Sequence, residues 1–141
     1  MVSVLCRIAF DLGVWSEGQF KTVVLCEEAH RYIPANREEN FGPTRAAIAR
    51  IAKEGRKYGV TLGLITQRPS ELDPTILSQC STIFSMRLGN DQDQEIMRKA
   101  ISGASRSYIN FLPSLANREA IAFGQGVSTP MRMIFREALP H

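Results

Sequence analysis

KTVVLCEE (Lys21–Glu28) and VTLGLITQ (Val60–Gln67) are the two stretches of sequence that decide the fold. Each holds a run of apolar and β-branched residues without the polar alternation of a half-exposed strand. Such runs predict strands that are buried on both faces, as in a parallel sheet. Polar side chains follow both runs, Glu27 and Glu28 after the first and Gln67 after the second. Because open α/β sheets bind ligands beyond the carboxyl ends of their strands, we expect these three side chains to share one edge.

Helices and further strands alternate around these two stretches. Helical spacing of apolar residues and capping residues predict the helices, and short apolar runs predict the strands. The pattern predicts an α/β fold in one domain, residues 1–141, with a mostly parallel sheet flanked by helices and a closing β-hairpin. Residues 34–43 are predicted to form a polar loop. The predicted helices are Val2–Val14, Thr44–Tyr58, Pro74–Gln79 and Asp91–Ile101 with Asp91 as the N-cap, and the further strands are Thr82–Met86, Glu119–Phe123 and Met131–Phe135.

The composition of the 141 residues excludes several classes of protein. Hydrophobic residues make up 44% and charged residues 22%, which indicates a globular chain rather than a disordered one. No apolar run approaches the roughly 20 residues that span a bilayer, and Arg7 and Asp11 interrupt any signal pattern, so we expect a soluble cytoplasmic protein without a membrane partner. The three cysteines, Cys6, Cys26 and Cys80, lie among apolar neighbours without a CxxC pair, which predicts buried, reduced thiols rather than structural zinc.

The adjacent carboxylates Glu27 and Glu28 carry the strongest chemical signal. Burying both is unfavourable unless a cation compensates their charge. Because side chains alternate in direction along a strand, the two carboxylates are expected to have separate tasks. One can hold Mg²⁺, directly or through water, and the other can orient or deprotonate an attacking water. A solvated strand end is the alternative interpretation. Gln67 is a weaker signal, since its amide can bond a terminal phosphate or the attacking water, or can simply end a strand.

Basic residues crowd the helix predicted between the two strands. The net charge of 17 − 14 = +3 by itself says little about nucleic acid. Residues 41–60, however, carry five basic side chains against Glu54 alone. A guanidinium group fits phosphate oxygens bidentately, and Arg56 at the helix end could reach a neighbouring subunit. A solvated charged face is the alternative. The five basic residues are Arg45, Arg50, Lys53, Arg56 and Lys57.

Four segments, taken together and in order, resemble the HerA-type hexameric DNA-translocating ATPases, relatives of FtsK among the RecA-like motors. The resemblance covers most of the chain, and EGRKYGVTLGLITQRPSELDPTILSQC is its most specific part. It implies the RecA-like fold, with ATP and Mg²⁺ as cofactors. The matching segments are VVLCEEAHRYIP (Val23–Pro34), IARIAKEGRKYGV (Ile48–Val60), LITQRPSELDPTILSQCSTIFSMRL (Leu64–Leu88) and REAIAFGQGVSTPMRMIF (Arg118–Phe135).

The resemblance implies a role for each polar residue at the strand ends. Val23–Glu28 resembles the Walker B strand, with Glu28 at the position of the catalytic glutamate. Glu27 stands where many such motors have the aspartate that supports Mg²⁺, and glutamate is one methylene longer but still an oxygen ligand. Gln67 matches the polar sensor residue after the next strand. His30 is interpreted as part of the turn after Walker B rather than as a metal ligand.

The resemblance also implies partners. Arg56 matches the arginine finger that reaches a neighbouring site and stabilises charge on the transferring phosphoryl group, with Arg50 on the same helix as its rival. The implied assembly is a homo-oligomer, a hexameric ring that grips double-stranded DNA through its backbone phosphates. A nuclease partner is also consistent with the resemblance.

The phosphate-binding loop of such motors is missing from this sequence. There is no GxxxxGK[ST], and none of the four lysines follows a glycine. Because that loop provides most of the triphosphate binding, we expect these 141 residues alone to show no ATPase activity. The chain therefore resembles the C-terminal part of a motor, from a truncated gene or one piece of a split ATPase. Since this fragment would lack the first core strand, we also expect an exposed sheet edge, exposed apolar surface and self-association.

Two other functions are compatible with the sequence. The initiator-like Met1 and the missing loop also fit a short protein that acts as a non-catalytic assembly or adaptor module. A metal-dependent hydrolase built on Glu27 and Glu28 is less favoured, because no further Asp or His ligand is suitably spaced nearby.

Overall fold

The computed structural model describes residues 1–36, 42–101 and 103–137 of the 141-residue chain. Part of the predicted loop 34–43 therefore lies outside the described residues. The chain divides into two compact units, Met1–Gln79 and Cys80–His141, and each is described by itself. All the predicted site residues belong to the first unit.

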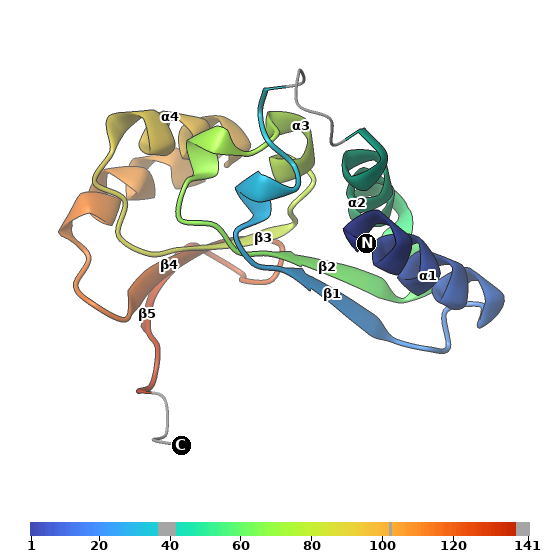
Figure 1. The fold of residues 1–141 in the computed structure, drawn as a ribbon. Helices are drawn as coiled ribbons and strands as arrows, with labels where there is room; N and C mark the ends of the chain where they lie inside the picture. Colours follow the sequence, from blue (N-terminus) through green and yellow to red (C-terminus); the bar gives the residue numbers. More distant parts are fainter. Residues whose placement is uncertain (37–41, 102, 138–141) are drawn as a thin grey trace. The chain divides into compact units, whose positions relative to one another are not determined.

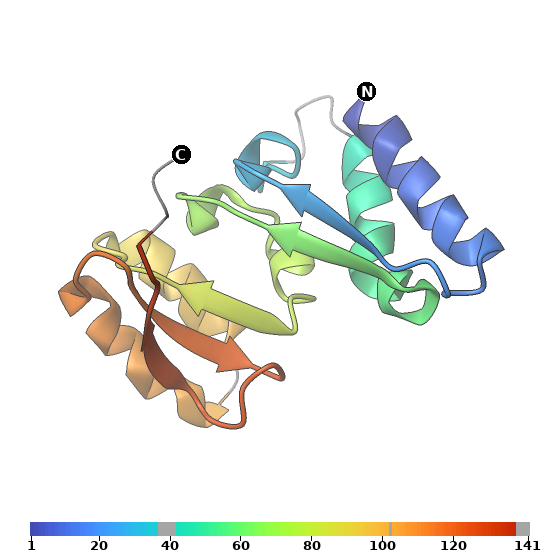
Figure 2. The same cartoon turned by 90° about the horizontal axis from the view of Figure 1, so that it is seen from below.

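The first unit is built on two parallel strands, as predicted. Strand β1 pairs with β2 in parallel, from Thr22 opposite Val60 to Cys26 opposite Leu64. The two arrows run the same way in Figures 1 and 2. The elements of this unit are α1 (Val2–Trp15), β1 (Thr22–Cys26), η1 (Ala29–Arg31), α2 (Gly42–Glu54), η2 (Gly55–Tyr58), β2 (Val60–Leu64), η3 (Pro69–Glu71) and α3 (Pro74–Leu77).

Helices α1 and α2 pack together on one face of the β1–β2 pair (Figures 1 and 2). The apolar face of α2 is buried through Ile48 and Ile51, as its helical spacing predicts. The turn into β2 leaves no room for a side chain at Gly55, where a Cβ would lie 2.4 Å from the Val60 carbonyl oxygen. Gly59 ends this turn in the left-handed conformation, φ 71°, which glycine adopts at low cost at the end of a helix.

The opposite face of β1 is open among the described residues, so the prediction of burial on both faces is wrong for this strand. Val23 is 69% exposed and Leu25 is 59% exposed, whereas Cys26 is buried. An apolar run shows that both faces of a strand can pack in a core. It does not show that other residues of the same chain cover both faces. The expected apolar surface is thus present, and the expected self-association stays a prediction.

Helix α1 forms where predicted, but most of its apolar residues are not buried. Cys6, Phe10 and Gly13 face inward. The apolar residues Val4, Leu5, Ile8, Leu12 and Trp15 are exposed and extend the apolar surface of this unit. No helix in the described part of the chain is both long enough and apolar enough to cross a membrane.

The second unit is an antiparallel sheet with helical turns packed against it. Its strands lie in the order β3–β4–β5, each antiparallel to its neighbour. The closing β-hairpin is therefore confirmed, but the mostly parallel sheet is not: β3 pairs antiparallel with β4 in this unit. The elements are β3 (Thr82–Ser85), α4 (Asp91–Ala100), η4 (Gly103–Ser114), β4 (Glu119–Gly124) and β5 (Met131–Ile134).

The core of the second unit explains why β3 pairs with β4. Strand β4 is the most buried strand, and its Ile121 and Phe123 join a cluster with α4 and η4. Ile83 of β3 packs against the same cluster. Helix α4 is capped by Asn90, whose side chain accepts the Gln92 N–H at 2.9 Å, rather than by the predicted Asp91. The turns of η4 were not predicted.

The three cysteines are free thiols, as predicted. Cys6 and Cys26 are buried, whereas Cys80 is only partly buried. Burial raises the pKa of all three thiols, and the neighbouring Cys6 raises the pKa of Cys26 further. Raised values keep the thiols protonated at neutral pH and lower their reactivity.

An ion pair between the buried Asp73 and the partly buried Arg45 fastens α2 to the start of α3. Asp73 is 1% exposed, caps α3 by accepting the backbone N–H groups of Thr75 and Ile76, and pairs with the Arg45 guanidinium. Burial acts to raise the Asp73 pKa, but these hydrogen bonds and the Arg45 charge outweigh it, so the pKa lies below its usual value. Arg45 therefore serves the fold and does not belong to a free basic face.

We predict that Asp73→Asn lowers the free energy of unfolding by about 2–4 kcal/mol at pH 7, because it leaves the Arg45 charge without its partner. The lowered pKa means that the native state holds the proton less tightly than the unfolded chain. Stability from this pair is therefore complete above the unfolded pKa of about 3.9 and is lost as pH falls through the lower folded value.

Urea unfolding from pH 7 down to pH 3 measures both effects. Asp91→Asn, which changes an exposed carboxylate, serves as the control and is expected to shift stability at pH 7 by less than about 0.5 kcal/mol. Equal stability of Asp73→Asn and the unmodified chain across this range would contradict the prediction.

Candidate active site

The site begins where the parallel ladder continues past the ends of β1 and β2. Ile65 N–H donates to the Cys26 carbonyl at 2.9 Å, and Ala29 N–H donates to the Ile65 carbonyl at 2.9 Å. The two segments that follow the strands are therefore held side by side. This places Glu27 and Glu28 at the same edge as Gln67, as the sequence predicts for parallel strands.

A second set of backbone contacts fastens the far ends of the same two segments. Asp73 N–H donates to the Ile33 carbonyl at 2.9 Å, and Ala35 N–H donates to the Glu71 carbonyl at 2.7 Å. Pro34 and Leu72 form an antiparallel bridge between these bonds. The segments 27–35 and 65–73 are thus clamped at both ends, with the candidate catalytic side chains on the stretch between them.

Glu28 occupies a backbone conformation that is unfavourable for its side chain. Its φ of 48° and ψ of 47° are left-handed, a region that costs an L-residue about 1–2 kcal/mol. Glu27, the residue before it, has no positive φ and is exposed. The left-handed turn ends β1 and starts η1 at once, so Glu28 stands at the corner rather than along the strand. Strained residues held by their surroundings gather at functional sites.

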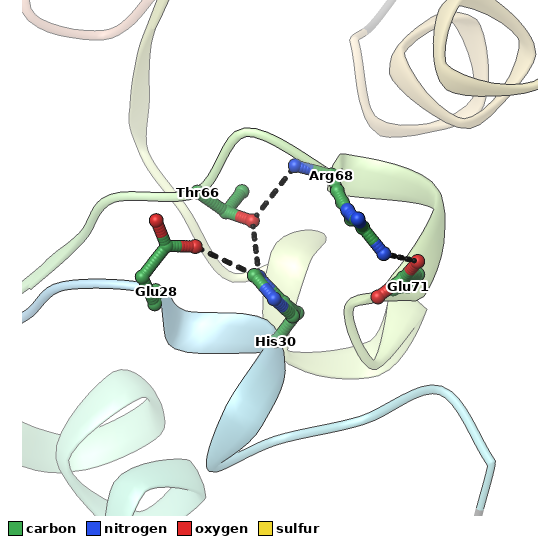
Figure 3. Close-up of polar contacts among 5 residues, drawn as sticks. All are labelled: Glu28, His30, Thr66, Arg68 and Glu71. Atoms are coloured by element: carbon green, nitrogen blue, oxygen red, sulfur yellow. Dashed lines mark hydrogen bonds and ion pairs between the residues drawn. The ribbon is translucent and has the colours of Figure 1, made fainter.

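The Glu28 side chain lies beside His30 and Thr66 (Figure 3). The His30 Nδ1 atom is 3.5 Å from a Glu28 carboxylate oxygen and 3.1 Å from the Thr66 hydroxyl oxygen. Thr66 directly precedes Gln67, and its hydroxyl also accepts the Arg68 N–H at 3.0 Å. Sequence reasoning assigned His30 only to the turn and overlooked Thr66, because no local pattern links two residues 36 positions apart.

Gln67 lies on an exposed bend between Thr66 and Arg68. The backbone on both sides of it is held, since the Arg68 N–H is bonded to Thr66 and the Arg68 side chain pairs with Glu71 at 2.8 Å. An amide presented on an anchored bend can meet a phosphate oxygen or a water molecule without ordering the backbone first.

The carboxylates at this edge suit a cation that takes some of its ligands from the protein and the others from a substrate. Among the described residues, no three His, Cys, Asp or Glu side chains form a group that could hold a metal ion. Mg²⁺ typically takes one or two carboxylates and completes its shell with water and substrate phosphates. The exposed Glu27 and the half-buried Glu28 fit that requirement and do not fit a closed, all-protein metal site.

The two candidate arginines do not join this edge. Arg56 lies in η2, just before the start of β2, whereas Glu28 and Gln67 follow the ends of β1 and β2. Arg56 is exposed and has no side-chain hydrogen bond or ion pair with the described residues. The Arg50 guanidinium instead lies over the Phe10 ring, 4.1 Å from its centroid. Neither arginine contributes to the Glu28 site of its own chain.

Comparison with the sequences of known proteins places this chain in a family. Over 111 residues the chain is 37% identical to the DNA double-strand break repair helicase HerA of Pyrococcus furiosus, a match that covers 79% of this chain and 20% of that protein. Against HerA of Sulfolobus acidocaldarius the identity is 33% over 124 residues, which cover 88% of this chain and 24% of that protein. The chain belongs to the HerA-like family. It spans about a fifth of the length of these curated relatives.

A solved structure supports the same fold. The genome packaging NTPase B204 from Sulfolobus turreted icosahedral virus 2, in complex with AMPPCP, matches with a TM-score of 0.72 at 16% identity. The match covers 96% of this HerA-like chain and 63% of B204. At that identity the likeness shows the fold alone. No family model matches the chain.

We predict that Glu28→Gly raises the free energy of unfolding by up to about 1 kcal/mol. Glycine relieves the left-handed strain of 1–2 kcal/mol, and its greater unfolded-state freedom offsets about half of that gain. Glu27→Gly is the matched control: the same residue type, one position earlier and without a positive φ, is expected to lose about 0.5–1 kcal/mol. Urea unfolding of both variants measures the difference, and a Glu28→Gly variant less stable than Glu27→Gly would contradict the strain.

Proposed function

We propose that this chain supplies the catalytic-glutamate, sensor and arginine-finger parts of an ATP-driven DNA-translocating motor. The observation that carries the proposal is the shared edge at which Glu28 and Gln67 follow two paired parallel strands, in a sequence related to HerA helicases. Nucleotide binding agrees with the fold, because B204, which shares it, was solved with ATP analogues.

In the proposed site, each polar residue at the strand ends has one task. Glu28, at the corner where β1 ends, accepts a proton from the attacking water. Glu27 holds Mg²⁺, which neutralises charge on the phosphates when it is bound. Gln67 donates its amide N–H to the terminal phosphate or orients the water with its oxygen.

Arg56 is proposed to act on the nucleotide of a neighbouring subunit. It lies at the amino end of β2, whereas Gln67 follows the carboxyl end, and the five residues between rise about 3.3 Å each. No arginine side chain spans that strand, so Arg56 does not reach a nucleotide bound beside Glu28 of its own chain. Arg50 is the weaker candidate, because its guanidinium already packs on Phe10.

The proposed assembly is a homo-oligomeric ring that grips double-stranded DNA through backbone phosphates. The arginine placement supports an assembly in which a neighbouring subunit completes each site, and a head-to-tail interface of that kind gives a ring where its rotation closes. DNA binding of this kind is expected to be largely independent of sequence and to weaken steeply with salt. Hexameric size and a nuclease partner remain parts of the proposal that rest on the resemblance.

We predict that Glu28→Gln in the full-length gene product lowers ATP turnover at least 100-fold and leaves ATP affinity within about threefold. The amide keeps the shape of the side chain but accepts no proton, so the chemical step fails while binding persists. Steady-state hydrolysis and a nucleotide-binding titration measure the two quantities. Glu27→Gln is the comparison and is expected instead to raise the Mg²⁺ concentration needed for half-maximal turnover. Full turnover by Glu28→Gln would remove the assignment.

Mixing variant subunits tests the role of Arg56. Arg56→Ala alone is expected to lose roughly 1,000-fold in turnover. A 1:1 mixture with Glu28→Gln subunits is expected to recover activity, because about a quarter of randomly formed interfaces pair an intact Glu28 with an intact Arg56. Arg50→Ala serves as the control in the same mixture. If Arg50→Ala rather than Arg56→Ala loses turnover and regains it in the mixture, Arg50 is the arginine finger. Full activity of Arg56→Ala alone would exclude Arg56 from this role.

A further inference from the structure

His30 stands between the proposed catalytic glutamate and the proposed sensor segment. One ring atom, Nδ1, faces both the Thr66 hydroxyl at 3.1 Å and the Glu28 carboxylate at 3.5 Å (Figure 3). The His30 side chain is 15% exposed, whereas the Glu28 side chain is 42% exposed. The imidazole is therefore the more fixed of the two groups, and the carboxylate is the one whose position it can restrict.

The contacts of the Thr66 hydroxyl indicate which way the hydrogen bond runs. Its oxygen already accepts the Arg68 N–H at 3.0 Å and has a second lone pair available. A bare Nδ1 lone pair would face the negative Glu28 carboxylate, which is unfavourable. With a hydrogen on Nδ1, His30 donates to Thr66 and attracts Glu28 at the same time. We assign the proton to Nδ1 on that basis, and the Thr66 O–H is then free to donate outward.

The main chain already holds the two segments together without this histidine. The backbone bonds from Ala29 to Ile65 and from Ile65 to Cys26 close the near end, and the bonds around Pro34 and Leu72 close the far end. What the main chain does not fix is the Glu28 carboxylate. Within the described residues, His30 is the side chain that pairs with it.

We propose that His30 is a positioning residue that ties the Glu28 carboxylate to Thr66. It thereby fixes the position of the base relative to the bend that carries Gln67. The inference rests on the proposed function, because it needs Glu28 as the base and Gln67 as the sensor. It assigns His30 and Thr66 to the chemical step rather than to nucleotide binding. A misplacement of the base by about 1 Å is enough to cost up to 100-fold in rate.

The test compares four variants of His30 and Thr66 with a control variant at Thr61, in the full-length gene product with ATP and double-stranded DNA. Asparagine places its amide nitrogen where His30 has Nδ1, whereas glutamine places it near the position of Nε2. We expect His30→Leu, His30→Gln and Thr66→Val to lower kcat roughly 10- to 100-fold with KM unchanged within threefold. His30→Asn is expected to recover most of the loss. Thr61→Val makes the same substitution at an exposed position of β2 and is expected to keep full activity.

The outcomes separate this inference from the function on which it rests. Glu28→Gln is measured beside the variants: if it abolishes turnover while His30→Leu and Thr66→Val do not, the positioning role is wrong and the proposed function stands. Equal activity of the asparagine and glutamine variants would also overturn the role, since a purely structural histidine has no preference for Nδ1. If Glu28→Gln keeps full turnover, both proposals fail. Thermal unfolding confirms that each variant is folded, and Thr66→Val, which removes only a hydroxyl, tests the contact if His30→Leu does not fold.

Discussion

The parallel pairing of β1 and β2 is the constraint on which the rest of the first unit depends. The pairing is in register over five residues and continues beyond the strands through the bonds of Ile65 and Ala29. Because successive side chains point to opposite faces, a slip of one residue would turn every strand side chain to the other face. It would also shift Thr66 along the segment that carries both Glu28 and His30, and so separate the Thr66 hydroxyl from the imidazole. The position of the acidic corner is therefore set by the backbone ladder and not by the acidic residues themselves.

The far ends of the site segments are anchored by a charge pair that takes no part in the proposed chemistry. The Asp73 carboxylate pairs with Arg45 of α2 and caps α3, and the Asp73 N–H donates to the Ile33 carbonyl. A site held at one end only would leave the Gln67 bend free to move about the strand ends. With both ends fixed, the polar side chains project from a short, supported stretch, which is what a preorganised site requires. The Asp73–Arg45 pair therefore links α2 to the segments that carry the candidate site, although neither residue belongs to that site.

The sequence predicted the features that depend on local pattern and missed those that depend on distant partners. Apolar runs identified β1 and β2, and the rule that parallel strands end at one edge was enough to predict that Glu28 and Gln67 lie together. No local pattern could show that Val23 is exposed, because an apolar run does not say which neighbour covers it. The antiparallel partner of β3 was missed for the same reason. The contact between His30 and Thr66 and the left-handed backbone of Glu28 follow from register and from a tight corner, and neither leaves a signature in residue type.

In the proposed ring, the separation of Arg56 and Gln67 gives β2 a second role. The strand has one end at the amino edge, where Arg56 is exposed, and the other at the edge that carries Gln67. Val60 at the start of the strand is buried, and just before Arg56 the backbone at Gly55 is packed too closely to admit even a methyl group. The pairing with β1 over all five residues holds this short strand between its two ends. If the proposed roles hold, each subunit would contribute to two nucleotide sites, one through its own Gln67 and one through its Arg56, because β2 keeps these residues at opposite ends.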